Sequence, residues 1–331
     1  MRSENQENLS LDYQSMMYEG VVYPPFIKAE ALNELREKHT LRSSDIVIAT
    51  FPKCGTTWMQ QIVLTLLADG DGSKVRQPMG MSPWLEAWVS NQGLAAFEAW
   101  HPEQTGWNGL ENSCDLAPDW CPSRRVLKTH APAQLAPWVG GTERDGMNGA
   151  RVIVVTRNPK DAAVSHYHHT IDLPHIFKYN GCWDYFLRKI WIPGKVESGS
   201  FWEWHQSWWQ VCQGGSVDLL WISYEELLSE PEKSISRVAK FIGLEPTTEL
   251  TKGVLTASNF QAMKQTAAEE DDKLVAIGKA DQVKRNHIRE GKSGSWTEIF
   301  TKTQNELMDR YHMGECSRLS LPPKLLPQMS L

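Results

Sequence analysis

Apolar runs with few polar interruptions set the pattern of this chain. Residues 46–49 and 151–156 are continuous apolar or β-branched runs, and residues 125–130 contain a shorter one. Runs of this kind are typical of strands that are buried on both faces of a parallel sheet. Residues 59–68 are compatible with a helix that follows the first run. The pattern therefore predicts an α/β domain.

The turn between the first predicted strand and this helix, residues 50–58, reads TFPKCGTTW. A strand, a tight turn with glycine and a helix start form a phosphate site, because free backbone N–H groups and the helix dipole face the anion. Lys53 adds a positive charge, and Thr56 and Thr57 add hydroxyl donors. The pattern G-x-x-x-x-G-K-[ST] is absent, so an ordinary ATP or GTP site is not predicted. An ordinary turn with a surface lysine is the simpler alternative.

A second anion site is predicted after residues 151–156. Arg157 follows the strand, Asn158 suits a helix N-cap, and Pro159 suits the first helical position, where its missing N–H costs nothing. Ser165 then lies less than two turns into the helix. We expect the guanidinium and this hydroxyl to converge on one anion. A charged helix cap is the alternative, but two such sites together indicate a ligand with two separated phosphate groups.

His130 is the candidate for proton transfer. It follows the residues RVLKT, and Pro132 favours the end of the strand at this point. A residue there lies at the carboxyl edge of the sheet, where open α/β sheets hold ligands. Imidazole titrates near neutral pH and suits a general base. A lone histidine at a strand end is more often structural, so its place between two predicted phosphate segments decides the interpretation.

These segments resemble the signatures of one family, the cytosolic sulfotransferases. Residues 50–58 fit T-[YF]-P-K-x-G-T-T-W, residues 157–165 fit R-[ND]-P-x-D-x-x-x-S, and residues 128–132 fit K-T-H-x-P. Residues 289–297 fit R-K-G-x-x-G-D-W-K in part. The resemblance covers roughly residues 40 to 312.

The resemblance implies an α/β fold with a single domain, in which helices flank both faces of a central, mostly parallel β-sheet in a P-loop-like sulfotransferase arrangement. The expected catalytic domain spans residues 21–315, between a flexible N-terminal segment, 1–20, and a C-terminal tail, 316–331. The spread of the nucleotide segments along most of the chain favours one domain over two.

The implied reaction transfers the sulfuryl group of 3′-phosphoadenosine 5′-phosphosulfate (PAPS) to a hydroxyl or amine of a small-molecule acceptor. Adenosine 3′,5′-bisphosphate (PAP) is the second product. By the resemblance, His130 is the general base, Lys53 meets the charge on the leaving oxygen, Lys128 stabilises the sulfuryl oxygens, and Ser165 completes the catalytic set. No metal is expected, because fixed lysines take the place of the Mg²⁺ ions of kinases.

The resemblance also assigns binding residues. The implied nucleotide site comprises Lys53, Cys54, Gly55, Thr56, Thr57, Trp58, Arg157, Ser165, Tyr224, Ser258, Phe260, Met263, Arg289, Glu290 and Gly291. The implied acceptor site comprises Phe51, His130, Trp84 and Trp88. Each aromatic residue in these sets has plain core packing as its alternative.

Glu290, Ser295 and Thr297 depart from the family pattern, which has lysine, aspartate and lysine at these positions. Glu290 puts an anion beside a phosphate, so we expect a lower nucleotide affinity, with partial compensation by Lys292. The family dimerisation pattern K-x-x-x-T-V-x-x-x-E also fits poorly, because Lys302 replaces its valine. A monomer or a weak homodimer is expected.

The net charge of −6, without long runs of Lys or Arg, argues against nucleic acid as a partner. Six cysteines without a regular framework predict reduced thiols and a cytoplasmic location. Cys54, beside a helix start and Lys53, is a candidate thiol of lowered pKa or a small filler. No apolar run reaches the ~18 residues of a membrane span, so no membrane partner is expected.

The chain has 15 tryptophans. Trp202, His205 and Trp209 have the spacing of one buried helix face. The tryptophans either line an aromatic cage for a flat or cationic acceptor or fill a large core. His166 and His169 share a helix face, but no carboxylate or cysteine completes a familiar metal site.

Three other functions compete with this one. A kinase-like phosphotransferase lacks its G-K-[ST] signature here. A PAP or PAPS sensor or scaffold without turnover is favoured by Glu290 and opposed by Lys53, Lys128, His130 and Ser165. A relative that uses sulfonation to drive dehydration differs from the first hypothesis only in its product.

Overall fold

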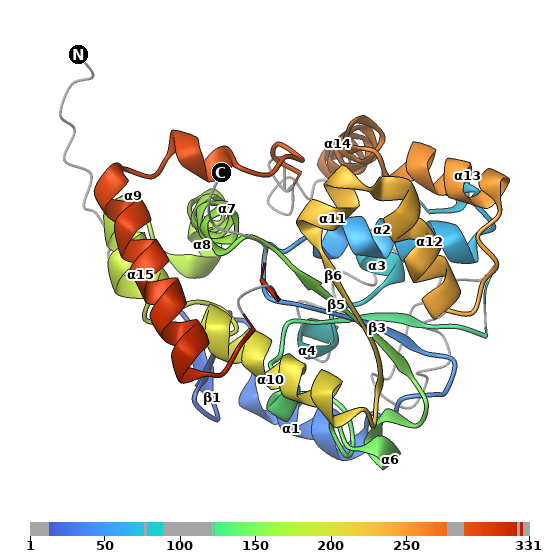
Figure 1. Ribbon diagram of the computed structural model, residues 1–331, viewed down its shortest axis with the longest axis horizontal. Helices are drawn as coiled ribbons and strands as arrows, with labels where there is room; N and C mark the ends of the chain where they lie inside the picture. The colour runs from blue at the N-terminus through green and yellow to red at the C-terminus, as the bar shows by residue number, and fades with distance from the viewer. Residues whose placement is uncertain are drawn as a thin grey trace.

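The computed structural model of the protein describes residues 13–75, 78–88, 121, 123–276, 288–322, 325 and 326. A central sheet crosses the molecule, with helices on either side of it (Figure 1). This arrangement confirms the predicted α/β fold with helices on both faces of one sheet. Among the described residues, no helix combines the length and the hydropathy that a membrane span needs.

The central sheet has four parallel strands in the order β4-β3-β5-β6. Their bounds are Ile46–Thr50 for β3, Val126–Thr129 for β4, Arg151–Thr156 for β5 and Asp218–Ser223 for β6. The three apolar runs of the sequence are therefore the three strands β3, β4 and β5. Ala49 pairs with Thr129 on one side and with Val154 on the other, so the strands end side by side. The segments that follow them begin at one edge of the sheet.

Each face of the sheet is covered by helices (Figure 1). On one face lie α2 (Thr56–Leu67), α12 (Pro231–Phe241) and α13 (Thr248–Ser258). On the other face lie α7 (Pro159–Asp172), α10 (Phe201–Gly214) and the π-helical segment η4 (Phe186–Trp191).

The remaining elements are shorter or lie at the periphery. The helical ones are α1 (Ala29–Lys38), η1 (Gly72–Lys74), α3 (Pro78–Met81), α4 (Leu85–Trp88), η3 (Ala133–Leu135), α6 (Arg144–Met147), α8 (Pro174–Phe177), α9 (Trp183–Tyr185), α11 (Tyr224–Ser229), α14 (Phe260–Ala276), η6 (Ser295–Glu298) and α15 (Lys302–Arg318). Strands β1 (Met16–Tyr18) and β2 (Val21–Tyr23) form an antiparallel pair. Secondary structure thus extends from Met16 in β1 to Arg318 in α15.

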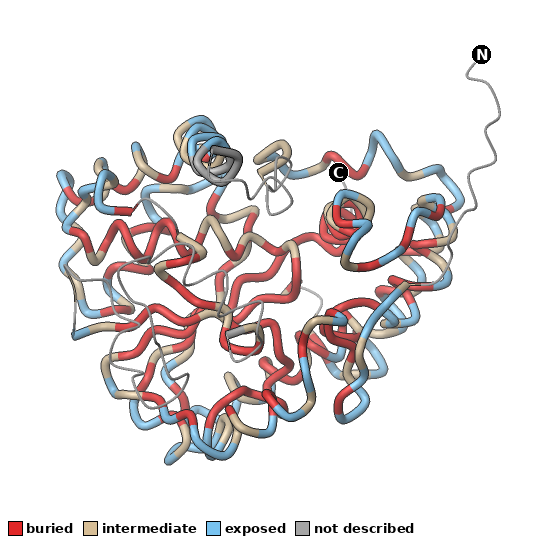
Figure 2. The backbone as a smooth tube through the Cα atoms, turned by 180° about the vertical axis from the view of Figure 1, so that it is seen from behind, coloured by how far each residue is buried: buried red, intermediate tan, exposed pale blue. Residues whose placement is uncertain are grey.

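Two apolar clusters fill the space between the sheet and its helices. Val47 and Ala49 belong to the cluster shared with α7 and α10, whereas Ile46 and Ile48 belong to the cluster shared with α2. Successive strand residues point to opposite faces, and here both faces are buried. For this reason β3 is a continuous apolar run without alternation. The buried backbone at the centre of Figure 2 corresponds to this sheet and the inner faces of the helices.

Most described tryptophans are part of the core. Trp138, Trp191, Trp202, Trp204 and Trp208 are all fully buried. The aromatic face of α10 is wider than the predicted spacing of 202, 205 and 209, and Trp209 itself is only half-buried. Trp100, Trp107 and Trp120 lie outside the described residues. For the buried members, core packing is the correct interpretation.

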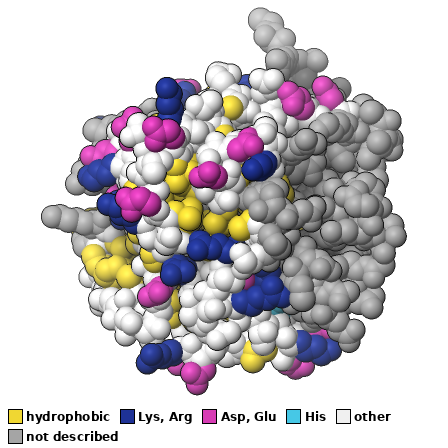
Figure 3. Space-filling model, turned by 90° about the vertical axis from the view of Figure 1, so that its right-hand side faces the viewer, with side chains coloured by type: hydrophobic (Ala, Val, Ile, Leu, Met, Phe, Trp, Pro, Cys, Tyr) yellow, Lys and Arg dark blue, Asp and Glu magenta, His cyan; other side chains and the backbone are white. Residues whose placement is uncertain are grey.

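Charged side chains of both signs are interspersed on the face shown in Figure 3, around a central hydrophobic area. The described part of that face carries no broad patch of one sign, in keeping with the modest net charge of −6. An anion site in this protein therefore depends on local side chains rather than on the charge of a whole surface.

Candidate functional site

A cavity of about 750 Å³ lies at the carboxyl edge of the sheet. Lys53, His130, Arg157 and Tyr224 line it, and they follow the strands β3, β4, β5 and β6. Parallel pairing brings these residues together although they are far apart in the chain. The four strand ends thus build one site.

Nearly all the residues predicted from the sequence line this cavity. They are Lys53, Gly55, Thr56, Thr57, Trp58, Trp84, Lys128, His130, Arg157, Ser165, Tyr224, Ser258, Phe260, Met263, Arg289, Glu290 and Gly291. The lining does not include Phe51 or Cys54. The side chain of Trp88, the last residue of α4, lies outside the described part of the chain.

Phe51 corrects one expectation, because its side chain is fully buried in the core. Its ring lies 5.2 Å from that of Phe201, in an edge-to-face arrangement. Residues two apart along an extended chain share a face, and Phe51 continues the series of Val47 and Ala49 toward α10. Phe51 therefore supports the site from behind and is not a wall of it.

Cys54 corrects a second expectation. Its thiol is also fully buried, and this burial raises the pKa of the thiol, although Arg157 and Lys53 act in the opposite direction. A buried neutral thiol is a poor nucleophile, so the expectation of a lowered pKa is wrong. The alternative interpretation, a small filler beneath the loop, fits this environment.

The loop between β3 and α2 turns through two residues with positive φ, Lys53 at 70° and Gly55 at 100°. Gly55 is the N-cap of α2, and a Cβ there would lie 2.8 Å from Cδ2 of Tyr224. Only glycine fits this conformation and this contact. Thr56 Oγ1 lies 2.7 Å from Thr50 Oγ1, which ties the helix start to the strand end. The loop is therefore a fixed cradle at a helix N-terminus.

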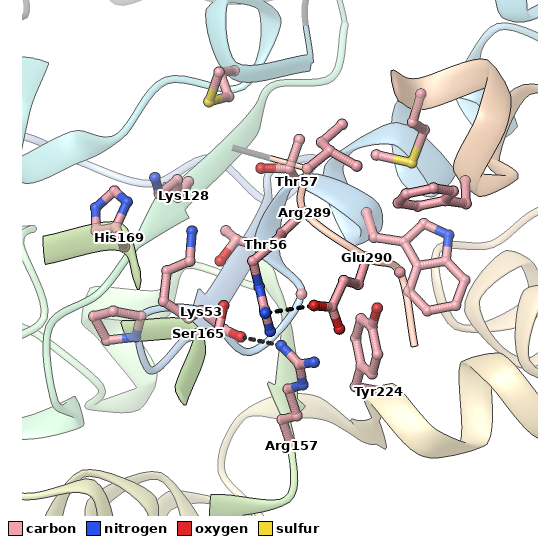
Figure 4. A pocket seen from close by; sticks show the side chains of 18 of the residues that line it. Lys53, Thr56, Thr57, Lys128, Arg157, Ser165, His169, Tyr224, Arg289 and Glu290 are labelled. Atoms are coloured by element: carbon pink, nitrogen blue, oxygen red, sulfur yellow. Dashed lines mark hydrogen bonds and ion pairs between the residues drawn. The ribbon is translucent and has the colours of Figure 1, made fainter. Parts of the chain in front are cut away.

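Arg157 is held at the next strand end. Its Nη1 donates to the carbonyl oxygen of Lys53 at 3.1 Å, and its guanidinium lies 4.4 Å from the ring centre of Tyr224 (Figure 4). Asn158 caps α7 through N–H groups of residues 160 and 161, as predicted. Ser165 of the same helix also lines the cavity. The guanidinium and the hydroxyl are thus on one wall, beside Lys53.

Asp161 anchors the late glycine-containing loop to these two segments. The buried carboxylate accepts hydrogen bonds from N–H of Gly294 at 2.7 Å and N–H of Trp296 at 3.0 Å. Nη2 of Arg157 also donates to the carbonyl oxygen of Lys292 at 3.1 Å. Sequence reasoning missed Asp161 as a site residue, although the pattern R-[ND]-P-x-D specifies an aspartate there.

Aromatic and apolar residues form the wall beside this loop. The rings of Trp58 and Tyr224 meet edge to face at 5.0 Å. Gly291 has a φ of 65°, and a Cβ there would lie 2.2 Å from Cδ2 of Phe260. The loop can approach α14 this closely only because residue 291 lacks a side chain. Ser258 uses its hydroxyl within α13, as a donor to a backbone carbonyl.

His130 is fixed in one tautomer. Its Nδ1 lies 2.7 Å from the carbonyl oxygen of Thr50, so Nδ1 carries the proton and Nε2 keeps a free lone pair. Burial, followed by the positive charge of Lys128, lowers the pKa of His130 well below its usual value. At neutral pH the ring is therefore uncharged and able to accept a proton.

Glu86 holds the backbone around His130. One oxygen of this buried carboxylate accepts from Oγ1 of Thr129 at 2.9 Å and from N–H of His130 and Ala131 at 2.8 Å each. Burial raises the pKa of Glu86. Trp84, two residues earlier, packs its ring 5.1 Å from that of His130. The sequence carried no signal for Glu86, because a single carboxylate 44 residues from its partner has no motif.

The pattern of the sulfotransferase domain family matches residues 43–319. Sulfotransferase 1B1 of Mus musculus is 31% identical over 300 residues, which cover 90% of this chain and 91% of that protein. The chain belongs to the sulfotransferase family. Its enzyme class, predicted from the sequence, is thereby confirmed.

Other sulfotransferases agree with this membership. Sulfotransferase 1A1 of Bos taurus is 30% identical over 87% of this chain and 89% of its own length. Among solved structures, mouse sulfotransferase SULT7A1 complexed with PAP matches 94% of this chain and 98% of its own, with a TM-score of 0.66 and 22% identity. Retinol dehydratase in complex with androsterone and PAP matches 94% and 91%, with a TM-score of 0.71 and 20% identity. At these identities the two structures establish the shared fold.

The residues of this sulfotransferase fit a ligand with phosphate groups. Nε of Arg157 is buried beside the cavity and has no hydrogen-bond partner among the described residues. An unsatisfied buried donor is costly, and an anionic ligand would satisfy it. Lys53 and Arg289 add further cationic groups to the same lining.

Apolar side chains also line the sulfotransferase cavity, with His169, Asp172 and Glu197 among the polar ones. Its lining includes Pro24 and Phe26 before α1, and Leu173, Ile176 and Phe177 around α8. The ring of Phe26 lies 6.0 Å from that of Trp84, which connects this wall to His130. Sequence reasoning missed these residues, because short connecting segments carry no periodic signal.

His166 is one of the two histidines predicted to share a face of α7. It is fully buried, and this burial lowers its pKa to about 3. Within the described residues, no three His, Cys, Asp or Glu side chains are arranged to hold a metal ion.

Proposed function

We propose that this sulfotransferase moves the sulfuryl group of PAPS to a hydroxyl or amine of an apolar small molecule, with His130 as the general base. One observation carries the proposal. The Nδ1 proton of His130 is bound by the carbonyl oxygen of Thr50, which leaves Nε2 as a base in the cavity that Lys53 and Lys128 also line.

The residues divide the chemistry between them. Nε2 of His130 takes the proton of the acceptor as its oxygen or nitrogen bonds to sulfur, a role worth about 10²–10⁴-fold in rate. Lys53 meets the negative charge that grows on the bridging oxygen as the bond between sulfur and this oxygen breaks. Lys128 stabilises the sulfuryl oxygens. A loose, in-line transfer needs positioning and charge more than covalent help.

The nucleotide half of the proposal rests on the cationic lining. We assign the 5′-phosphosulfate to the cradle of Lys53, Gly55 and Thr56, and the 3′-phosphate to Arg157, Ser165 and Arg289. Trp58, Tyr224 and Phe260 supply a flat apolar wall suited to a purine. The unsatisfied Nε of Arg157 supports the 3′-phosphate assignment.

The acceptor half rests on the apolar wall. Phe26, Leu173, Ile176 and Phe177 favour an acceptor with an apolar body, and His130 requires that its reacting group be a hydroxyl or amine. The structural relative retinol dehydratase was solved with androsterone and with retinol. Apolar alcohols of this kind are therefore the first acceptors to test.

Two measurements test this function. Thermal shift with PAP and with Mg-ATP should show selective stabilisation by PAP, and selective stabilisation by Mg-ATP would refute the proposal. Labelled PAPS with phenols, steroids, alkanols, amines and guanidines should then give a sulfonated product. His130→Ala should lower the rate of this transfer by about 10²–10⁴-fold, while PAP still stabilises the protein.

A nucleotide sensor without turnover is the second candidate. It is favoured by the ion pair of 2.6 Å between Arg289 and Glu290, which engages a cation of the nucleotide wall. If the protein releases PAP from PAPS only when an acceptor is present, and if His130→Ala slows this release, the protein is not a sensor without turnover.

We further propose that the protein is a cytoplasmic monomer or weak homodimer. Free cysteines support the compartment, since Cys54, Cys121, Cys182, Cys212 and Cys316 form no disulfide among the described residues. Light scattering over a range of concentrations tests the oligomeric state.

A further inference from the structure

Three cationic residues, Arg157, Arg289 and Lys292, lie on or beside the late glycine-containing loop, and we call them the clamp. The clamp contains an anion of its own. Glu290 Oε1 lies 2.6 Å from Nη1 of Arg289, and Glu290 Oε2 lies 3.6 Å from Nζ of Lys292. Glu290 also lines the cavity (Figure 4). Its carboxylate therefore sits between two cations in the place where an anionic ligand is expected to bind.

The position of Glu290 is not that of a free surface carboxylate. Its side chain is 30% exposed, and that of Arg289 is 25% exposed. Oε2 is buried and has no hydrogen-bond partner among the described residues. Charge interactions in such partly buried places are screened less than on an open surface.

We propose that Glu290 is an internal competitor for the 3′-phosphate, and that it sets how strongly the site distinguishes nucleotides with this phosphate from those without it. The inference rests on the proposed function. The carboxylate occupies Nη1 of Arg289, so a 3′-phosphate competes with it for this donor and also meets the repulsion of its negative charge. Both effects weaken binding of PAP and leave the 5′ half of the nucleotide untouched.

The fixed part of the clamp explains why the competition is confined to one phosphate. Arg157 is held by the carbonyl oxygens of Lys53 and Lys292 and by the ring of Tyr224, and no carboxylate is bonded to it among the described residues. Of the cations assigned to the 3′-phosphate, Arg289 is the one that an internal carboxylate engages directly.

Glu290→Gln tests the inference, because it removes the charge and keeps the shape. Titration calorimetry with PAP and with adenosine 5′-monophosphate (AMP) measures both affinities in the wild type and the variant. We expect PAP to bind about tenfold more tightly to the variant, while AMP binding changes less than about twofold.

Glu298→Gln is the matched control. Glu298, the last residue of η6, accepts from Nζ of Lys292 at 2.9 Å, but it is 66% exposed and does not line the cavity. This variant should bind PAP and AMP as the wild type does.

Three outcomes would overturn the inference. They are unchanged PAP affinity in Glu290→Gln, an equal gain for PAP and AMP, and an equal gain for PAP in Glu298→Gln. If PAP and AMP bind to none of the three proteins at millimolar concentration, the proposed function itself fails and this inference falls with it.

Discussion

Asp161 offers the sharpest test of how the site is assembled. Its buried carboxylate accepts N–H of Gly294 at 2.7 Å and N–H of Trp296 at 3.0 Å, together with hydroxyls of Ser293 and Ser295. The substitution Asp161→Ala removes the acceptor of all four donors. The loop that carries Arg289 then loses these hydrogen bonds to α7.

The size of the effect follows from these contacts. Each buried N–H without an acceptor costs about 1–3 kcal/mol. Gly294 is only half-buried, so water can accept a hydrogen bond from its N–H and reduce this cost. We expect the free energy of unfolding to fall by about 2–4 kcal/mol. An unfolding entropy of about 2.1 cal/mol/K per residue gives about 0.7 kcal/mol/K for this chain, hence a Tm lower by about 3–6 °C.

Thermal denaturation with and without PAP measures both consequences. Asp161→Ala should have the lower Tm and should gain less from PAP than the wild type, because the clamp around Arg289 is no longer held. Asp145→Ala, at an exposed position in α6, is the control and should match the wild type. A Tm within about 1 °C of the wild type, with an equal gain from PAP, would refute the reasoning.

Three further predictions concern charge and titration. His130→Ala should lower kcat by about 10²–10⁴-fold. In the wild type, kcat should stay level as the pH falls through 6.5, because burial and the charge of Lys128 lower the pKa of His130. A decline of kcat at pH 6.5 would contradict this. Lys53→Ala and Arg157→Ala should each weaken PAP binding by about 2–4 kcal/mol in calorimetry, and unchanged affinity in both would contradict the site. Burial lowers the pKa of His166 and of His205 to about 3, so unfolding takes up protons below the ordinary histidine pKa of 6.5. Urea unfolding should therefore show about 3 kcal/mol less stability at pH 5 than at pH 6.5, and equal stability at both would exclude neutral imidazoles.

The sequence predicted three strands of the central sheet, β3, β4 and β5, because their signals are local. β5 forms from one continuous apolar run, and Asn158 and Pro159 cap α7 next to it in the chain. In both cases the signal lies within a few consecutive residues. Turn chemistry at Gly55 has the same local origin. The roles assigned to these residues by resemblance stay predictions until the variants are measured.

The errors came from side-chain direction. Phe51 and Cys54 lie in a loop that was expected to face the ligand, yet both side chains point into the core. Which way a loop side chain points depends on the packing of α10 and the sheet behind it, and a motif of consecutive letters does not contain that information.

By itself, the order of residues determined an α/β fold, its buried parallel strands β3, β4 and β5 and the helix starts after β3 and β5, since each follows from the conformational preferences of neighbouring residues. Only the tertiary structure brought Glu86 to His130, Asp161 to the loop of residues 293–296, and Glu290 onto Arg289 within the cavity wall. Hydrogen bonds and ion pairs act over a few ångströms in space, whatever the separation along the chain. Their partners are therefore known only once the strands have paired and the helices have packed.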